Sequence, residues 1–123
     1  MNFVWERLAD GVFRCAPEHR VTSAVVDLGD RTVSVSHPGR GHTGHDLIAV
    51  VTGSDRPVVF CGDLVEESGD PAIDADSDPM VWPATLERVL EGGGEDAVFV
   101  PGHGAVVDAA FVRRQRDWLR TQM

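Results

Sequence analysis

Short apolar runs separated by glycine-containing turns are the feature that most constrains the fold of this 123-residue chain. The alternation in Thr32-Val33-Ser34-Val35-Ser36 is typical of a strand with one buried face. Gly29-Asp30 lies between two such runs and fits a two-residue hairpin turn, because glycine adopts positive φ without steric cost. The opening segment from Phe3 to Cys15 reads as strand–turn–strand around Ala9-Asp10-Gly11. Further strands are predicted over residues 21–28, 32–36, 47–52, 58–61 and 97–100.

Two helices are predicted in the second half of the chain. The first runs from about Pro83 to Glu91, because proline suits a first helical turn and the glycines at 92–94 end a helix. The second runs from about Asp108, an N-cap residue, to Thr121, with arginines 113, 114 and 116 largely outside its buried face. The expected inner faces hold Leu86, Val89 and Leu90 in the first helix, and Phe111, Val112, Trp118 and Leu119 in the second. Together the elements predict an α/β protein, with a mixed sheet and flanking helices in one domain.

The charge balance is acidic and narrows the class of partner. The chain has 20 Asp and Glu against 11 basic residues, all of them Arg, for a net charge of −9. This sign disfavours binding to nucleic acid and to anionic membranes. The longest apolar run, Leu47 to Val51, is far too short for a membrane span, and the first ten residues lack the apolar region of a secretory signal.

The two cysteines, Cys15 and Cys61, are far apart in the sequence. Two cysteines are too few for a disulfide framework or a cysteine-based zinc module. A single disulfide bond between Cys15 and Cys61 stays an open alternative. A cytoplasmic location is therefore expected.

Three turns carry residues suited to chemistry, and each lies where a predicted strand begins or ends. They contain His42, Asp63 and His103, each beside a glycine that lets the backbone turn sharply. Neutral imidazole and carboxylate are natural ligands for Zn²⁺, Fe or Mn²⁺. The three turns together favour a metal site over three unrelated structural residues.

The same turns resemble the later motifs of the metallo-β-lactamase superfamily. The resemblance is carried by Pro38-Gly39-Arg40-Gly41-His42-Thr43-Gly44-His45-Asp46, by Val59-Phe60-Cys61-Gly62-Asp63-Leu64-Val65 and by Val100-Pro101-Gly102-His103-Gly104. Residues 1–15 resemble the first strands of that family, and residues 21–121 resemble its C-terminal half. The resemblance implies about half of a four-layer αββα sandwich, formed by a single truncated domain over residues 1–123.

The resemblance also implies roles for individual residues. His42 would be a ligand of a first metal, His103 of a second, and Asp63 would bridge the two. Asp46 and Thr43 would brace the loop beside the ligands. Members of the family use two Zn²⁺ ions, or iron in some branches, to activate a water that attacks an ester, thioester, amide or phosphodiester.

The sequence departs from the family at its first metal-binding motif. No H-x-H-x-D-H segment is present, so each metal would keep only two of its ligands. A catalytic zinc has three protein ligands and a water, so weak or sub-stoichiometric metal binding is expected. A single metal shared by His42, Asp63 and His103 is one alternative. Another is that His19, His37 or His45 replaces a lost ligand.

Other ligand motifs fit less well. The glycine-rich segment 37–46 lacks the Gly-Lys-Ser/Thr ending of a phosphate loop. Asp74-x-Asp76-x-Asp78 resembles the start of a calcium loop, but Pro79 and Thr85 stand where glycine and glutamate are needed. Residues 66–78 are therefore expected to form an exposed acidic loop.

Two functions follow from these observations. The first is a metal-dependent hydrolase-like protein with an incomplete site and an unknown small-molecule substrate, weakly active or inactive as a monomer. The second is a non-catalytic remnant of the family with a structural or protein-interaction role. Both predict self-association, because the missing strands leave an exposed sheet edge and an apolar face.

Overall fold

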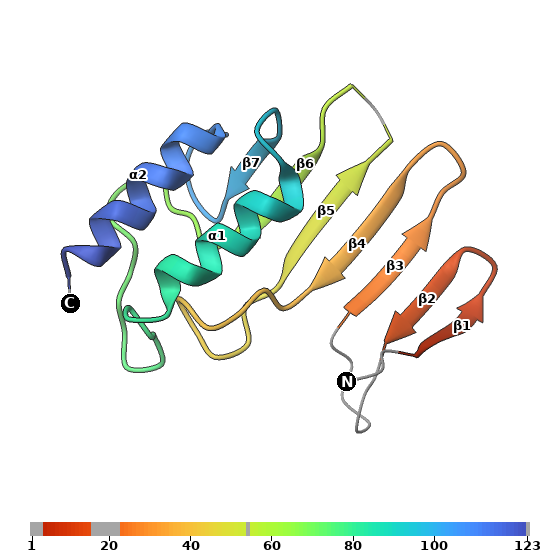
Figure 1. Ribbon diagram of the computed structural model, residues 1–123, viewed down its shortest axis with the longest axis horizontal. Helices are drawn as coiled ribbons and strands as arrows, with labels where there is room; N and C mark the ends of the chain where they lie inside the picture. The colour runs from red at the N-terminus through yellow and green to blue at the C-terminus, as the bar shows by residue number, and fades with distance from the viewer. Residues whose placement is uncertain (1–3, 16–22, 54, 123) are drawn as a thin grey trace.

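The computed structural model describes residues 4–15, 23–53 and 55–122, which form one mixed sheet and two helices (Figure 1). The seven strands lie across the sheet in chain order. Their bounds are β1 Trp5–Ala9, β2 Val12–Cys15, β3 Ser23–Asp27, β4 Thr32–Ser36, β5 Ile48–Thr52, β6 Val58–Gly62 and β7 Val98–Pro101. All neighbouring pairs are antiparallel except β6 and β7, which are parallel and are joined through helix α1 (Trp82–Gly93). Helix α2 (Ala109–Arg120) follows β7.

The turns and caps agree with the predictions from local sequence. Gly29 has φ 91° in the turn between β3 and β4. The Asp108 side chain caps α2 by accepting a hydrogen bond of 2.9 Å from the Phe111 N–H. Helix α1 extends two residues further than predicted, to Gly93, and ends at Gly94, which has φ 88°. Residues 21 and 22 of the predicted third strand lie outside the described residues.

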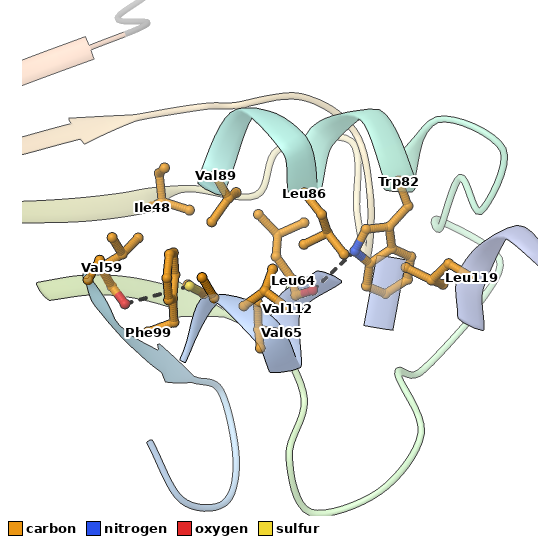
Figure 2. Packing of buried hydrophobic residues seen from close by; sticks show 13 residues of the cluster. Ile48, Val59, Leu64, Val65, Trp82, Leu86, Val89, Phe99, Val112 and Leu119 are labelled. Atoms are coloured by element: carbon orange, nitrogen blue, oxygen red, sulfur yellow. Dashed lines mark hydrogen bonds between the residues drawn. The ribbon is translucent and has the colours of Figure 1, made fainter. Parts of the chain in front are cut away.

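The core lies between the two helices and the β5–β7 end of the sheet (Figure 2). The helices pack against each other and contact β5, β6 and β7, whereas β1 to β4 project beyond them (Figure 1). The largest fully buried side chains are Trp82, Phe99, Leu64, Leu86 and Leu119. The predicted class, a mixed sheet with flanking helices forming half of a sandwich, is confirmed.

The face of the sheet opposite the helices is apolar. Residues paired across neighbouring strands point to the same face, and the register aligns two rows on it. The first row is Val12, Val26, Val33, Val51, Val58 and Val98, and the second is Arg14, Ala24, Val35, Ala49, Phe60 and Val100. None of these side chains is fully buried.

The structure bears on three expectations: the exposure of Arg116, the possible disulfide and the possibility of a membrane span. The Arg116 side chain was expected largely outside the buried face of α2, but it is only 19% exposed and pairs with Glu87 of α1 at 3.7 Å. The aliphatic part of the Arg116 side chain packs on the two helices, and its guanidinium group pairs with Glu87. No disulfide joins Cys15 and Cys61. Within the described residues, neither helix is long and apolar enough to cross a membrane.

Candidate metal centre

The topology brings the three chemistry-bearing turns to one end of the sheet. Asp63 follows β6 directly, and His103 follows the neighbouring parallel strand β7. Because the carboxyl ends of parallel strands meet at the same edge of a sheet, these two residues are adjacent. The loop between β4 and β5, which carries His42, lies at the same end, because β4 and β6 run in the same direction on either side of β5.

The carboxylate of Asp63 lies between the two histidines. Its Oδ2 atom is 3.5 Å from Nε2 of His42, and its Oδ1 atom is 3.4 Å from Nδ1 of His103. The His42 side chain is 17% exposed and the His103 side chain 64%, so the site opens to solvent on the His103 side. The structure therefore brings together the three residues that the sequence singles out, with one carboxylate oxygen facing each histidine.

Glu66 also belongs to this site, although the sequence placed it in an exposed acidic loop. Its Oε2 atom is 2.9 Å from Nδ1 of His103, and its side chain is only 12% exposed. Among the described residues, one group brings three potential ligand atoms within 4.8 Å of one another, and it consists of Asp63, Glu66 and His103. His42 lies outside that group and faces the other carboxylate oxygen of Asp63.

A sequence signal for Glu66 exists in hindsight. Leu64 and Val65, between Asp63 and Glu66, are fully buried. Two consecutive buried residues anchor the backbone, so the next side chain has a fixed position near the end of β6. Net acidity and lack of periodicity in residues 66–78 concealed this anchoring.

The electrostatics of the site favour positive charge. The hydrogen bond to Glu66, with the negative charges of Glu66 and Asp63, raises the pKa of His103. Partial desolvation alone would raise the pKa of Glu66, but hydrogen bonds from Ser68 and His103 hold it below its usual value. The same carboxylates would attract a metal cation.

The hydrogen bonds of His42 fix its ring. Its Nδ1 atom is 2.9 Å from the carbonyl oxygen of Ala72. A carbonyl only accepts hydrogen bonds, so Nδ1 carries the proton, and in the neutral ring Nε2 presents a lone pair toward Asp63. A lone pair facing a carboxylate at 3.5 Å is unfavourable unless a cation or a proton lies between them. This is the orientation of a metal-ligating histidine supported by a backbone carbonyl.

Thr43 and Asp46 lie within the loop beside His42. The Asp46 carboxylate accepts hydrogen bonds of 2.8 Å from both the backbone N–H and the hydroxyl of Thr43. These contacts close the loop on itself and leave Asp46 outside the group of potential ligands.

His37 and His45, two of the histidines considered as replacement ligands, do not join the group. Nδ1 of His37 is 2.6 Å from the backbone oxygen of Asp46, and His45 is exposed. Neither is part of the ligand group that the described residues form. His19 lies outside the described residues.

The other candidate ligands have different roles. Asp78 pairs with Arg40 at 3.3 Å and accepts a hydrogen bond from the N–H of Val81 at the start of α1. The described part of the chain therefore does not gather the calcium-loop carboxylates around one point. Burial raises the pKa of the Cys61 thiol to about 12, so this residue does not supply a thiolate at neutral pH.

Comparison with known proteins agrees with the fold and the motifs. No family model matches the sequence. The metallo-beta-lactamase type 2 of Bacillus cereus is 30% identical over 95 residues, which are 76% of this chain and 36% of that protein. The chain therefore spans about a third of the length of this curated relative.

Solved structures with the same fold include metallo-β-lactamases. The metallo-beta-lactamase from Pontibacter korlensis has a TM-score of 0.68 and 27% identity, over 82% of this chain and 47% of that one. VMB-1 has a TM-score of 0.65 over 98% of both chains, and at 12% identity it is a likeness of fold alone. The sheet, its helices and these matches define a metallo-β-lactamase fold. The chain belongs to the metallo-β-lactamase superfamily.

Proposed function

We propose that this protein is a metal-dependent, hydrolase-like member of the superfamily whose metal site is incomplete, and that it is weakly active or inactive as a monomer. The observation that carries the proposal is the position of Asp63, with one oxygen toward His42 and the other toward His103. Imidazole and carboxylate groups at these separations fit a divalent cation.

His42, Asp63 and His103 would supply metal ligands, with one oxygen of Asp63 toward each histidine. Zn²⁺ is the first candidate, with Fe and Mn²⁺ as alternatives. A bound ion of this kind supplies Lewis-acid polarisation and an activated water. The chain itself contributes orientation. Ala72 holds the ring of His42, and Thr43 and Asp46 brace the same loop. The proposed substrate is a small molecule, and a β-lactam is the first compound to test because of the activity in the names of the relatives.

Metal content per chain tests this proposal. Protein purified without chelator or metal-binding tag is expected to hold at most about one Zn, Fe or Mn per chain. The combined variant His42→Ala, Asp63→Ala and His103→Ala is expected to hold none. Hydrolysis of a β-lactam, an ester and a thioester is then compared between the two proteins. Absence of metal from the unaltered protein, even in excess Zn²⁺, would contradict the proposal.

A second candidate function is association between two copies of the chain, and the apolar rows on the helix-free face favour it. The rows contain one charged residue, Arg14, which forms an ion pair of 3.0 Å with Glu6 beside it on β1. Over β2 to β7, two copies of this chain of net charge −9 can therefore meet without opposing carboxylates. Six strands at about 4.8 Å spacing make this face about 24 Å wide. A stable interface buries about 800 Å² on each partner, which corresponds to a square about 28 Å wide. The width of this face is therefore similar to that of a stable interface. We propose that the face packs against the same face of a second copy.

The expected result is that the protein sediments as a dimer at micromolar concentration and that Val51→Glu makes it monomeric. A glutamate in the middle of the valine row would bury a charge in the contact. Thr52→Glu is the matched control, because Thr52 is the next residue of β5, points to the other face and is exposed. A folded, monomeric unaltered protein under these conditions would overturn this second proposal.

A further inference from the structure

We infer that Glu66 is a metal ligand, and that Asp63, Glu66 and His103 together form a site for one divalent metal ion. This inference rests on the metal binding proposed above and adds a residue that the motifs of the family do not contain. It supplies a third ligand on the Oδ1 side of Asp63, where the motifs alone provide two.

The spacing of the donor atoms fits one small cation. Two ligands about 2.1 Å from a tetrahedral metal lie about 3.4 Å from each other. Nδ1 of His103 is 3.4 Å from Oδ1 of Asp63 and 2.9 Å from Oε2 of Glu66. All three donor atoms lie within 4.8 Å of one another, so small side-chain rotations suffice to reach such a geometry.

The chain holds Glu66 in this position from several directions. Its backbone N–H donates to Oε1 of Gln115, a buried residue of α2 whose Nε2 donates to the Leu64 oxygen. Its Oε1 atom accepts hydrogen bonds from Ser68, which leaves Oε2 directed at His103. The carboxylate is therefore positioned before any ligand arrives.

The backbone ties the other side of the site to the same segment. The Gly102 N–H donates to the Val65 oxygen at 3.1 Å, and the Glu67 N–H donates to the His103 oxygen at 3.2 Å. These bonds fix the turn after β7 against the turn after β6. The positions of His103 and Glu66 are thus coupled through the main chain, as a preformed ligand set requires.

The charge and the number of ligands are also appropriate. Two carboxylates and one neutral imidazole balance a divalent cation, and three protein ligands leave a fourth position open to water. On the other side of Asp63, His42 and Oδ2 provide only two donors. The inference therefore predicts one metal ion per chain rather than two.

The experiment compares Glu66→Gln with Glu67→Gln by equilibrium dialysis against Zn²⁺ and by visible absorption with Co²⁺. Both variants remove one negative charge from adjacent residues, but the Glu67 side chain accepts a hydrogen bond from the Ala105 N–H and is outside the ligand group. We expect Glu66→Gln to weaken metal binding at least about tenfold and to change the Co²⁺ spectrum. Glu67→Gln is expected to bind as the unaltered protein does. Far-UV circular dichroism of each variant establishes that it is folded.

Asp63→Asn separates failure of this inference from failure of the proposed function. If Asp63→Asn loses metal while Glu66→Gln binds normally, Glu66 is not a ligand and the proposed metal centre stands without it. If Glu66→Gln and Glu67→Gln weaken binding equally, general charge explains the effect and the inference is overturned. If the unaltered protein binds neither Zn²⁺ nor Co²⁺, both the inference and the proposed function are overturned.

Discussion

Replacing Trp82 by alanine is expected to destabilise the protein by about 3–5 kcal/mol, because it removes the largest buried side chain of the core. Trp82 is fully buried at the start of α1, and its indole N–H donates to the Leu64 oxygen at 3.1 Å (Figure 2). Its ring also lies 6.0 Å from the ring of His42, so it joins the core to the metal centre. Since domains of this size are stable by about 5–15 kcal/mol, the loss is a large fraction of the total.

Urea unfolding followed by circular dichroism measures this loss. Trp5→Ala is the matched control, because Trp5 is 47% exposed on strand β1, and its substitution is expected to cost less than about 1 kcal/mol. Equal costs for the two substitutions would show that the hydrophobic core is not centred between the helices and the β5–β7 end of the sheet.

The second large effect is expected at Gly102, where alanine should weaken metal binding by at least about tenfold without removing any ligand. A Cβ atom at this position would overlap Oδ1 of Asp63. The carboxylate is the end of a side chain and can rotate away, so the fold should survive while the ligand is displaced. The next nearest atom, the backbone carbon of Gly62, is 3.0 Å from that Cβ, which adds a modest cost in stability.

Gly69→Ala is the control for this prediction. Gly69 lies in the loop between β6 and α1, and a Cβ added to it meets no atom within 4 Å. Titration with Zn²⁺ and unfolding in urea, applied to both variants, separate binding from stability. Unchanged affinity in a folded Gly102→Ala protein would show that Oδ1 of Asp63 does not contact the metal.

The elements of the fold were largely readable from local sequence. The strand from Thr32 to Ser36 and the hairpin at Gly29-Asp30 occur as predicted. So does the cap at Asp108. These features depend on neighbours within a few residues: period-two alternation, positive φ at glycine and a side chain that reaches the next turn. The end of α1 was harder to predict, because the three consecutive glycines each weaken the helix and do not specify at which of them it ends.

The candidate site was only partly readable. The sequence identifies three candidate metal ligands at the ends of strands, His42, Asp63 and His103, and the sheet brings them together. Glu66 and Gln115 were missed, because their positions depend on contacts between residues 49 apart along the chain. A local sequence pattern does not predict a contact between residues so far apart in the chain.

What the sequence by itself determined is the local conformation, the family and the residue types at the strand ends. Turns, caps and alternation are set by short-range sterics and hydrogen bonds, which act within a few residues. Only the tertiary structure decided which carboxylate joins His103, which face of the sheet the helices leave uncovered and how Asp63 is shared between the two histidines. The physical reason is that these arrangements follow from the order and register of strands and from the packing of α2 against the segment after β6, which bring together residues far apart in the chain.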